Sequence, residues 1–147
     1  MSGGAAERYT LDTSAIVAFF ANEPGADQVE GILVLAEKRK AEVNVSFMTY
    51  MELTYQLWRR GGEKAGKLAY LRLKALGLKR VDVSEGLTLR AARIKASFEL
   101  SVADAWIAAT ALITEGRLVH KDPEFRPLSR LLSLVELPLK PSRRSPL

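Results

Sequence analysis

The chain has 147 residues, of which 48% are hydrophobic and 27% charged, and it contains no cysteine. This length suits one ordinary domain, and the composition excludes a disordered chain, a collagen-like repeat and a disulfide-stapled miniprotein. The net charge is +5, but Lys140, Arg143 and Arg144 stand in a proline-rich tail, so the basic character is only a weak pointer to nucleic acid.

Short β-prone segments alternate with segments of helical periodicity along the chain. Strands are predicted at residues 9–11, 42–45, 78–83, 117–119 and 134–137. Helices are predicted at residues 15–20, 28–40, 47–60, 63–76, 85–98 and 102–115, with N-caps at Ser46, Ser84 and Ser101 and C-terminal glycines at Gly77 and Gly116. The alternation favours an α/β domain with a small, mainly parallel sheet of four to five strands flanked by helices.

The predicted domain spans residues 8–137. Residues 1–7 are expected to form a flexible N-terminus and residues 138–147 a basic, proline-rich tail. No segment has the pattern of an export signal or of a membrane span, so a soluble cytoplasmic protein is expected.

Acidic residues follow two of the predicted strands, where a parallel sheet places its ligand sites. Asp12 comes directly after the first strand and Asp122 comes shortly after the fourth. Each also has a structural explanation, because Asp12 is a good helix N-cap and Asp122, before Pro123, suits an Asx-turn or a cap.

Two further acids lie on predicted helices. Asp104 forms an S-x-x-D capping box with Ser101, yet it shares a helical face with Ile107 and other apolar residues. A carboxylate on such a face needs a cation or becomes protonated. Glu52 suits an exposed helix position, although the surrounding residues 47–58 are otherwise sparse in charge.

Together these acids form a pattern that resembles the PIN-domain family, and within it the VapC toxins of prokaryotic toxin–antitoxin pairs. The resemblance runs from about Tyr9 to Leu137. Its segments are Leu-Asp-Thr-Ser-Ala at 11–15, Glu52 in its helix, Val-Ala-Asp-Ala-Trp-Ile-Ala-Ala-Thr-Ala at 102–111, and Val-His-Lys-Asp-Pro-Glu-Phe at 119–125. The first and third segments are the most specific.

The resemblance implies a three-layer PIN-like sandwich and an endoribonuclease that depends on Mg²⁺ or Mn²⁺ and is the toxin of a VapBC-type pair. It also implies a homodimer and an antitoxin protein that covers the site. The catalytic acids are then Asp12, Glu52, Asp104 and Asp122. Asp12, Asp104 and Asp122 are assigned as metal ligands, and Glu52 orients or deprotonates the attacking water or helps to hold a second ion. One histidine and no cysteine argue against zinc.

Three residues are predicted to support the site or contact the substrate: Thr13, Ser14 and His120. The family commonly has Ser or Thr at the position of His120, two residues before the last acid. An imidazole there would support the metal site, approach the metal or contact the scissile phosphate, and the alternative is a simple surface residue.

A basic segment follows the third predicted helix. Residues 59–80 contain eight basic side chains and one acid, Glu63. We predict weak RNA binding by Arg59, Arg60, Lys64 and Lys67, against the alternative of a solvated helix face. The aromatic residues Tyr50, Tyr55 and Trp58 are expected to pack in a core or a dimer interface rather than to stack on bases.

Two other functions are compatible with an α/β domain. A non-catalytic PIN-like domain that binds RNA or protein would be favoured by the loss of one acid, and none is lost. A nucleotide-binding module of flavodoxin or Rossmann type would need a glycine-rich turn after the first strand, which Asp12-Thr13-Ser14 does not supply.

Overall fold

The computed structural model describes residues 7–139, so residues 1–6 of the predicted flexible N-terminus and residues 140–147 of the predicted basic tail lie outside the described residues. Glu7, predicted to belong to the flexible N-terminus, instead begins the first strand. Five strands form one parallel sheet in the order β3-β2-β1-β4-β5. They are β1 (Glu7–Leu11), β2 (Ala41–Ser46), β3 (Lys79–Val81), β4 (Arg117–His120) and β5 (Leu134–Glu136). Among residues 7–139, no helix is both long and apolar enough to cross a bilayer.

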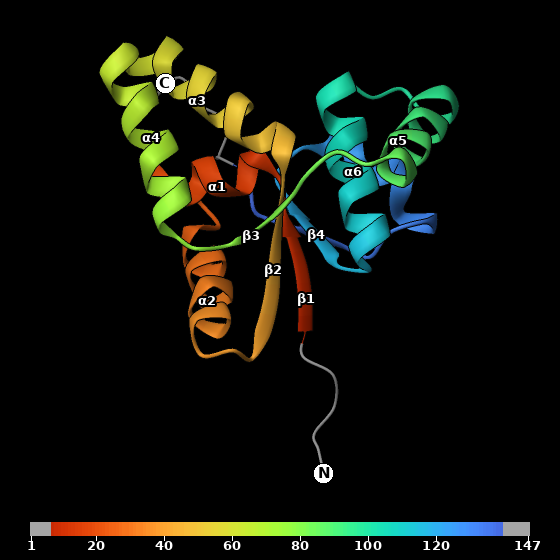
Figure 1. The fold of residues 1–147 in the computed structure, drawn as a ribbon. Helices are drawn as coiled ribbons and strands as arrows, with labels where there is room; N and C mark the ends of the chain where they lie inside the picture. The colour runs from red at the N-terminus through yellow and green to blue at the C-terminus, as the bar shows by residue number, and fades with distance from the viewer. Residues whose placement is uncertain (1–6, 140–147) are drawn as a thin grey trace, which may run out of the picture.

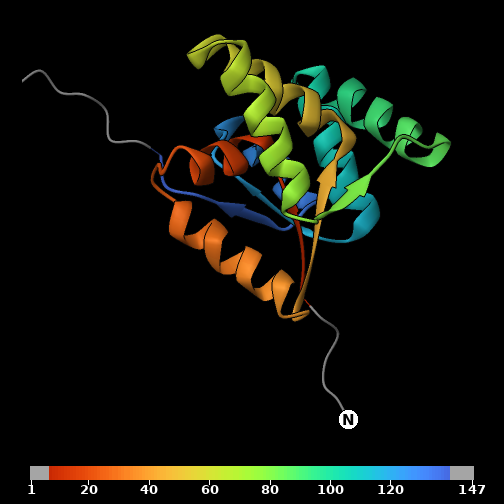
Figure 2. The same ribbon diagram turned by 60° about the vertical axis from the view of Figure 1, so that its left-hand side comes forward.

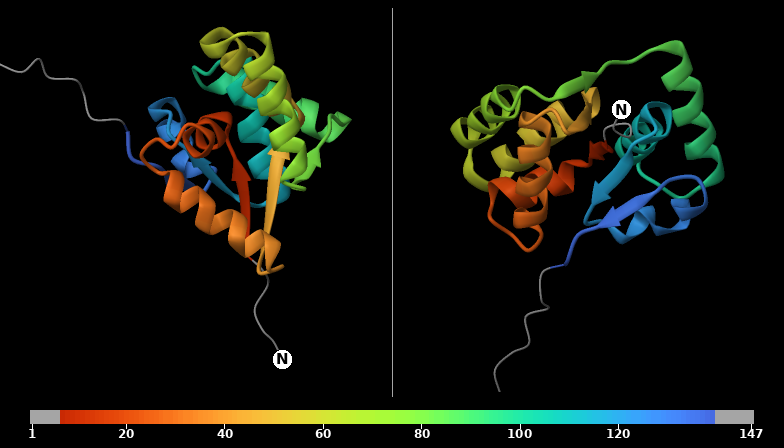
Figure 3. Two further views of the ribbon diagram at one scale, coloured as in Figure 1. Left: turned by 90° about the vertical axis from the view of Figure 1, so that its left-hand side faces the viewer. Right: turned by 90° about the horizontal axis from the view of Figure 1, so that it is seen from below.

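Helices cover both faces of this sheet and give the predicted three-layer sandwich (Figures 1 and 3). One face carries α1 (Thr13–Phe20), α2 (Ala26–Glu37), α3 (Phe47–Gly61) and α4 (Glu63–Ala75). The other carries α5 (Glu85–Ser97), α6 (Val102–Thr114) and the 3₁₀ segment η1 (Pro123–Arg130). Each face has its own apolar core, because parallel strands are buried on both sides.

The strand residues divide between these two cores by simple alternation. Tyr9 and Leu11 of β1 point into the core of α1–α4, while Thr10 lies on the other side, 3.2 Å from the hydroxyl of Thr114 on α6. In β4, Val119 belongs to the first core and Leu118 to the second. The sheet therefore separates two apolar cores and contributes side chains to both.

The order of the strands reverses beside β1. The chain builds β2 and β3 on one side of β1, passes through α5 and α6, and then adds β4 on the other side. The backbone N–H of Asp12 donates to the carbonyl of Val119 across these two strands, at 2.9 Å. Such a reversal opens a crevice at the carboxyl ends of the two strands, where α/β proteins place their ligands.

Several predicted boundaries differ from the observed ones. The helix predicted at 28–40 begins at Ala26 and ends at Glu37, and the strand predicted at 78–83 is limited to the short edge strand β3. The helix predicted to run to Glu115 and end at Gly116 ends one residue earlier, at Thr114, and its left-handed residue is Glu115, with φ of 55°. A Cβ on Gly116 would instead lie 3.2 Å from the carbonyl carbon of Tyr9, so this glycine permits close approach to β1.

A second close approach fixes the pairing of α3 with α4, which lie side by side in Figure 2. A Cβ on Gly66 of α4 would lie 2.7 Å from the carbonyl oxygen of Thr54 and 2.8 Å from the Cβ of Trp58 on α3. A side chain at position 66 therefore forces the two helices apart.

We expect Gly66→Ala to lower the free energy of unfolding by about 1–3 kcal/mol through this overpacking. The matched control is Gly31→Ala in α2, where an added Cβ meets no atom within 4 Å. That change is expected to raise the free energy of unfolding by about 0.5–1 kcal/mol, because alanine loses less backbone entropy than glycine in a helix. Urea denaturation measures both, and equal effects of the two substitutions would contradict the close packing of α3 on α4.

Candidate active site

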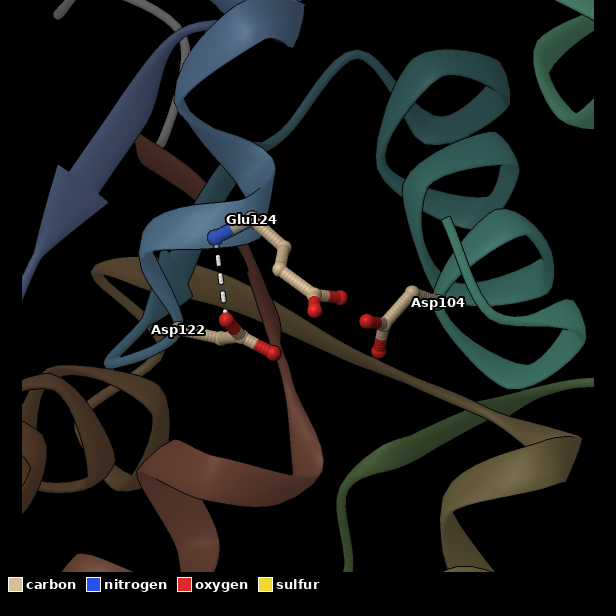
Figure 4. Close-up of side chains that lie close together, drawn as sticks. All are labelled: Asp104, Asp122 and Glu124. Carbon is tan, nitrogen blue, oxygen red and sulfur yellow. Dashed lines mark hydrogen bonds between the residues drawn. The ribbon is translucent and has the colours of Figure 1, made fainter. Parts of the chain in front are cut away.

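Three acidic side chains meet at the crevice beside β1 and β4. Asp104 of α6 and Asp122 and Glu124 at the start of η1 each offer a carboxylate oxygen, and these oxygens all lie within 4.8 Å of one another. Figure 4 shows the side chains pointing toward one another from the two elements. We call Asp104, Asp122 and Glu124 the acidic triad.

Helix capping places all three members of the acidic triad. Asp122 is the N-cap of η1, and its Oδ1 accepts a hydrogen bond from the backbone N–H of Glu124 at 2.9 Å. Ser101 is the N-cap of α6, and its hydroxyl oxygen accepts from the backbone N–H of Asp104 at 3.0 Å. Among residues 7–139 the Asp104 carboxylate accepts no hydrogen bond in return, so only half of the predicted capping box forms.

Asp12 directly follows β1 and is 3% exposed, and its carboxylate repels those of Asp104 and Asp122. Its Oδ2 caps α1 by accepting hydrogen bonds from the Ser14 hydroxyl and from the Ser14 backbone N–H, the latter at 3.0 Å. Its Oδ1 is buried without a hydrogen-bond partner among the described residues. Capping therefore accounts for one carboxylate oxygen of Asp12 and leaves the other uncompensated, which favours a cation at this site.

Thr13 and Ser14 connect the acids to the surrounding elements. The Thr13 hydroxyl donates to Oε1 of Glu52 at 2.5 Å, and its oxygen lies 3.2 Å from the hydroxyl oxygen of Thr49. Ser14 contacts Asp12 and accepts a hydrogen bond from the backbone N–H of Lys121 at 3.0 Å. The first turn of α1 thus makes hydrogen bonds to the side chains of Asp12 and Glu52 and to the backbone of Lys121, the residue before Asp122.

Burial and mutual repulsion raise the pKa values of these acids. Burial raises the pKa of Asp12 to about 7, with added repulsion from Glu52 and Asp122 and with opposition from the Ser14 hydrogen bonds. Burial first, and then repulsion from the carboxylates of Asp12, Asp122, Glu52 and Glu124, together raise the pKa of Asp104 to about 7. Glu52 has a raised pKa for the same main reason, burial. Five acids therefore share one electrostatic neighbourhood that a divalent cation would relieve.

His120 is fully buried, so its interpretation as a surface residue is wrong. Its ring packs edge-on against Phe125 with centroids 5.2 Å apart, and neither ring nitrogen has a hydrogen bond of ordinary geometry within residues 7–139. Burial lowers its pKa, against the opposing effects of Glu136 and of the Asp122 backbone and carboxylate. His120 lies outside the acidic triad and packs beneath the segment that carries Asp122.

Glu124 is the member of the acidic triad that the sequence analysis did not single out, whereas Asp12, one of the three predicted ligands, is not in the triad. A signal for Glu124 exists in the sequence. Asp122 followed by Pro123 is the pattern of an N-cap and the first residue of a helical turn. Glu124 then lies in the first turn, where its side chain is close to the cap residue Asp122.

The predicted RNA-binding residues lie on the α3–α4 hairpin, and Arg60 lines a surface pocket together with Ser14 and Lys121. Arg59 and Arg60 lie in the last turn of α3, and Lys64 and Lys67 are exposed on α4. Arg60 lies 3.7 Å from the Glu23 carboxylate, and Lys67 pairs with Glu63 at 2.5 Å. Their role in binding RNA stays a prediction.

Comparison with known proteins agrees with this architecture. A family model described as "PIN domain" matches residues 9–131. No curated protein sequence matches.

Several solved structures share the fold. DNA-bound VapBC from Salmonella typhimurium has a TM-score of 0.69 at 17% identity, covering 88% of this chain and 98% of that one. VapBC2 from Rickettsia felis, bound to a promoter DNA fragment, has a TM-score of 0.67 at 17% identity, covering 89% and 99%. VapC20 from Mycobacterium tuberculosis, described as a sarcin–ricin loop cleaving toxin, has a TM-score of 0.62 at 20% identity, covering 81% and 93%. At these identities the likeness shows a common fold.

Proposed function

Since this chain belongs to the PIN-domain family, we propose that it is a metal-dependent endoribonuclease that hydrolyses RNA phosphodiester bonds. The observation that carries the proposal is the gathering of Asp104, Asp122 and Glu124 beside the buried, partnerless Oδ1 of Asp12. No sulfur or imidazole ligand belongs to this cluster, so its donors are all carboxylate oxygens.

Oxygen donors of this kind suit Mg²⁺ or Mn²⁺. The acidic triad would hold the ion, with Asp12 as a further ligand or as a charge close behind it. A divalent cation in such a site stabilises the negative charge that develops on the phosphoryl oxygens and lowers the pKa of water.

The remaining polar residues would act on the water and on the carboxylates. Glu52 has a raised pKa and is held by the Thr13 hydroxyl, so it is suited to orient the attacking water and accept its proton. Ser14 holds Asp12 in one orientation through two hydrogen bonds. His120 shapes the segment before Asp122 through its packing on Phe125.

We further propose that the chain is the toxin of a VapBC-type pair, acts in the cytoplasm, binds an antitoxin protein and forms a homodimer. Support comes from the fold shared with VapBC complexes from Salmonella typhimurium and Rickettsia felis. Light scattering of the purified protein tests the homodimer, and co-purification with the product of an adjacent gene tests the antitoxin.

Cleavage of a labelled, mostly single-stranded RNA tests the enzymatic proposal. The wild-type protein is incubated with Mg²⁺, with Mn²⁺ and with EDTA. We expect cleavage with either ion and none with EDTA. A folded wild-type protein that neither cleaves RNA nor binds Mn²⁺ would favour the alternative, a non-catalytic PIN-like domain that binds RNA or protein.

The role of Glu124 can be tested apart from catalysis. We expect Glu124→Gln to weaken Mn²⁺ binding by about 10-fold or more, because one of three converging carboxylates loses its charge. Isothermal titration calorimetry measures the affinity. The matched control is Glu115→Gln at the opposite end of α6, which is expected to bind Mn²⁺ like the wild type. Equal affinities of the two variants would remove Glu124 from the metal site.

A further inference from the structure

A surface pocket of about 490 Å³ lies beside the acids, where α1 and α3 meet the segment that joins β4 to η1. The helices α1 and α3 lie against each other there (Figure 1). The polar side chains that line the pocket are Ser14 of α1, Gln56 and Arg60 of α3, Glu23 and Lys121. We call it the basic pocket.

Ser14 joins the basic pocket to the candidate active site. Its hydroxyl donates a hydrogen bond to Oδ2 of Asp12 and accepts one from the backbone N–H of Lys121 at 3.0 Å. Lys121 in turn directly precedes Asp122, a member of the acidic triad. The basic pocket and the acids are thus linked through one shared residue and through neighbouring residues of the chain.

The basic pocket also lies on the face of α3 that carries Glu52. Gln56 and Arg60 follow Glu52 by four and eight residues, so the three side chains project from one side of the helix. Glu52 accepts a hydrogen bond from the Thr13 hydroxyl, so this side of α3 faces α1. Arg60 lies two turns along α3 from Glu52, about 12 Å at the rise of an α-helix. A strand that reaches Glu52 and continues along this face therefore enters the pocket.

Two cations in the basic pocket face one carboxylate. The Lys121 side chain is only 10% exposed, and its Nζ donates to the carbonyl of Pro24 at 2.9 Å and lies 3.7 Å from the carboxylate of Glu23. The Arg60 guanidinium lies 3.7 Å from the same carboxylate. An ammonium has three N–H donors and a guanidinium five, so these partners among the described residues leave donors on both cations. The charges of the three side chains sum to +1.

We propose that the basic pocket binds a phosphodiester group of the RNA that neighbours the scissile one, with Arg60 and Lys121 donating hydrogen bonds to its non-bridging oxygens. This proposal rests on the proposed ribonuclease function. A phosphodiester carries one negative charge, which matches the net charge of the pocket, and its oxygens accept charge-assisted hydrogen bonds from arginine and lysine. The Gln56 amide adds an uncharged donor.

The location of the basic pocket favours RNA over an acidic segment of a protein as the occupant. An RNA whose scissile phosphodiester lies at the acidic triad has further phosphates beside it, so it brings an anion to the neighbouring surface whatever its sequence. That surface is accessible whenever the triad receives substrate, because Ser14 belongs to both sites. A phosphate held in the pocket fixes the strand relative to the acids without reading its bases.

Binding of a short single-stranded RNA, measured by fluorescence anisotropy in EDTA to prevent metal-dependent cleavage, tests the proposal. We expect Arg60→Gln to weaken binding roughly 3- to 10-fold at low salt. The slope of log affinity against log salt concentration is expected to fall by about 0.7, the value for one phosphate contact on a single strand. Arg60 is chosen because it is half-exposed in the last turn of α3, whereas Lys121 is held inside the fold by Pro24.

Two other substitutions remove the same charge elsewhere. Arg90→Gln changes an exposed residue of α5, on the opposite face of the sheet, and is expected to bind RNA as the wild type does. Arg59 neighbours Arg60, but its guanidinium lies 5.1 Å from the ring centroid of Tyr55 and outside the pocket, so Arg59→Gln is expected to weaken binding less. A series of RNAs with one uncharged methylphosphonate at successive positions locates the contact. We expect one position at which Arg60→Gln and the wild type bind equally.

Equal affinities of the wild type and of Arg60→Gln, folded by circular dichroism, would overturn the proposal. Losses of equal size in Arg59→Gln and Arg60→Gln would also overturn it, because they indicate a diffuse basic field. A loss of affinity for a co-purifying antitoxin with unchanged affinity for RNA would make the pocket a protein-binding site instead. If the wild type binds RNA through Arg60 but never cleaves it with Mn²⁺, the ribonuclease proposal fails while the pocket stands as a phosphate site.

Discussion

Replacing Asp104 with Asn is expected to reduce RNA cleavage by about 100-fold or more. Asp104 supplies one of the three carboxylates of the acidic triad. Its carboxylate accepts no hydrogen bond among the described residues, so both of its oxygens are available to bind a cation at the triad. Removing it lessens the stabilisation that a divalent cation gives to the phosphoryl charge, which is worth several kcal/mol. Initial rates on labelled RNA at saturating Mn²⁺ measure the loss.

The control for this substitution is Asp27→Asn, which changes an exposed acid in the first turn of α2 and is expected to leave the rate unchanged. Asn has nearly the shape of Asp, and the Ser101 cap of α6 uses the backbone of residue 104, so the fold is retained. Cleavage by Asp104→Asn at the wild-type rate would exclude Asp104 from the site and direct the search to another set of residues.

The same substitution is expected to stabilise the metal-free protein at alkaline pH. The pKa of Asp104 rises from 3.8 to about 7 on folding, so the folded state binds this proton more tightly than the unfolded state. The resulting destabilisation is absent below pH 4, grows as the pH rises from 4 to 7, and is complete above pH 7. Its size is on the order of 4 kcal/mol at roughly 1.4 kcal/mol per pH unit.

Urea denaturation in EDTA at pH 5 and pH 8 measures this effect. We expect Asp104→Asn to be more stable than the wild type at both values, by a margin that is clearly larger at pH 8. The difference between variant and wild type reports the charge of Asp104 together with its repulsion of the neighbouring carboxylates, whereas titrating groups far from the site contribute equally to both proteins. Mn²⁺ is expected to stabilise the wild type strongly at pH 8 and Asp104→Asn much less. A margin that does not change with pH would contradict the raised pKa of Asp104.

The local patterns of the sequence determine most of the secondary structure. Serine caps predict the starts of α3, α5 and α6, and the structure confirms each serine as a cap. Alternating short strands and helices predict the parallel sheet and its layers. These features depend on neighbours within a few residues, so periodicity and capping chemistry suffice to find them. The acids Asp12 and Asp122 are likewise found from the rule that parallel sheets bind ligands at strand ends.

The tertiary structure decides features that depend on contacts between distant segments. Gly116 is needed because β1 passes close to it, and no local signal distinguishes this from a helix-ending glycine. His120 is buried because Phe125 and the second core enclose it, although one polar residue at a strand end fits a surface as well. Glu124 joins Asp104 only when η1 folds back against α6.

The electrostatic repulsion among the acids also depends on tertiary structure. The sequence by itself identifies which carboxylates stand near strand ends, because that follows from chain order. It does not determine that Asp12 and Asp104 are both desolvated and that their carboxylates repel each other. Burial and repulsion depend on contacts in space between residues that are far apart in the chain. The positions of Asp12 and Asp122 at strand ends are thus a property of the sequence, whereas the addition of Glu124 and the raised pKa values of Asp12 and Asp104 are properties of the fold.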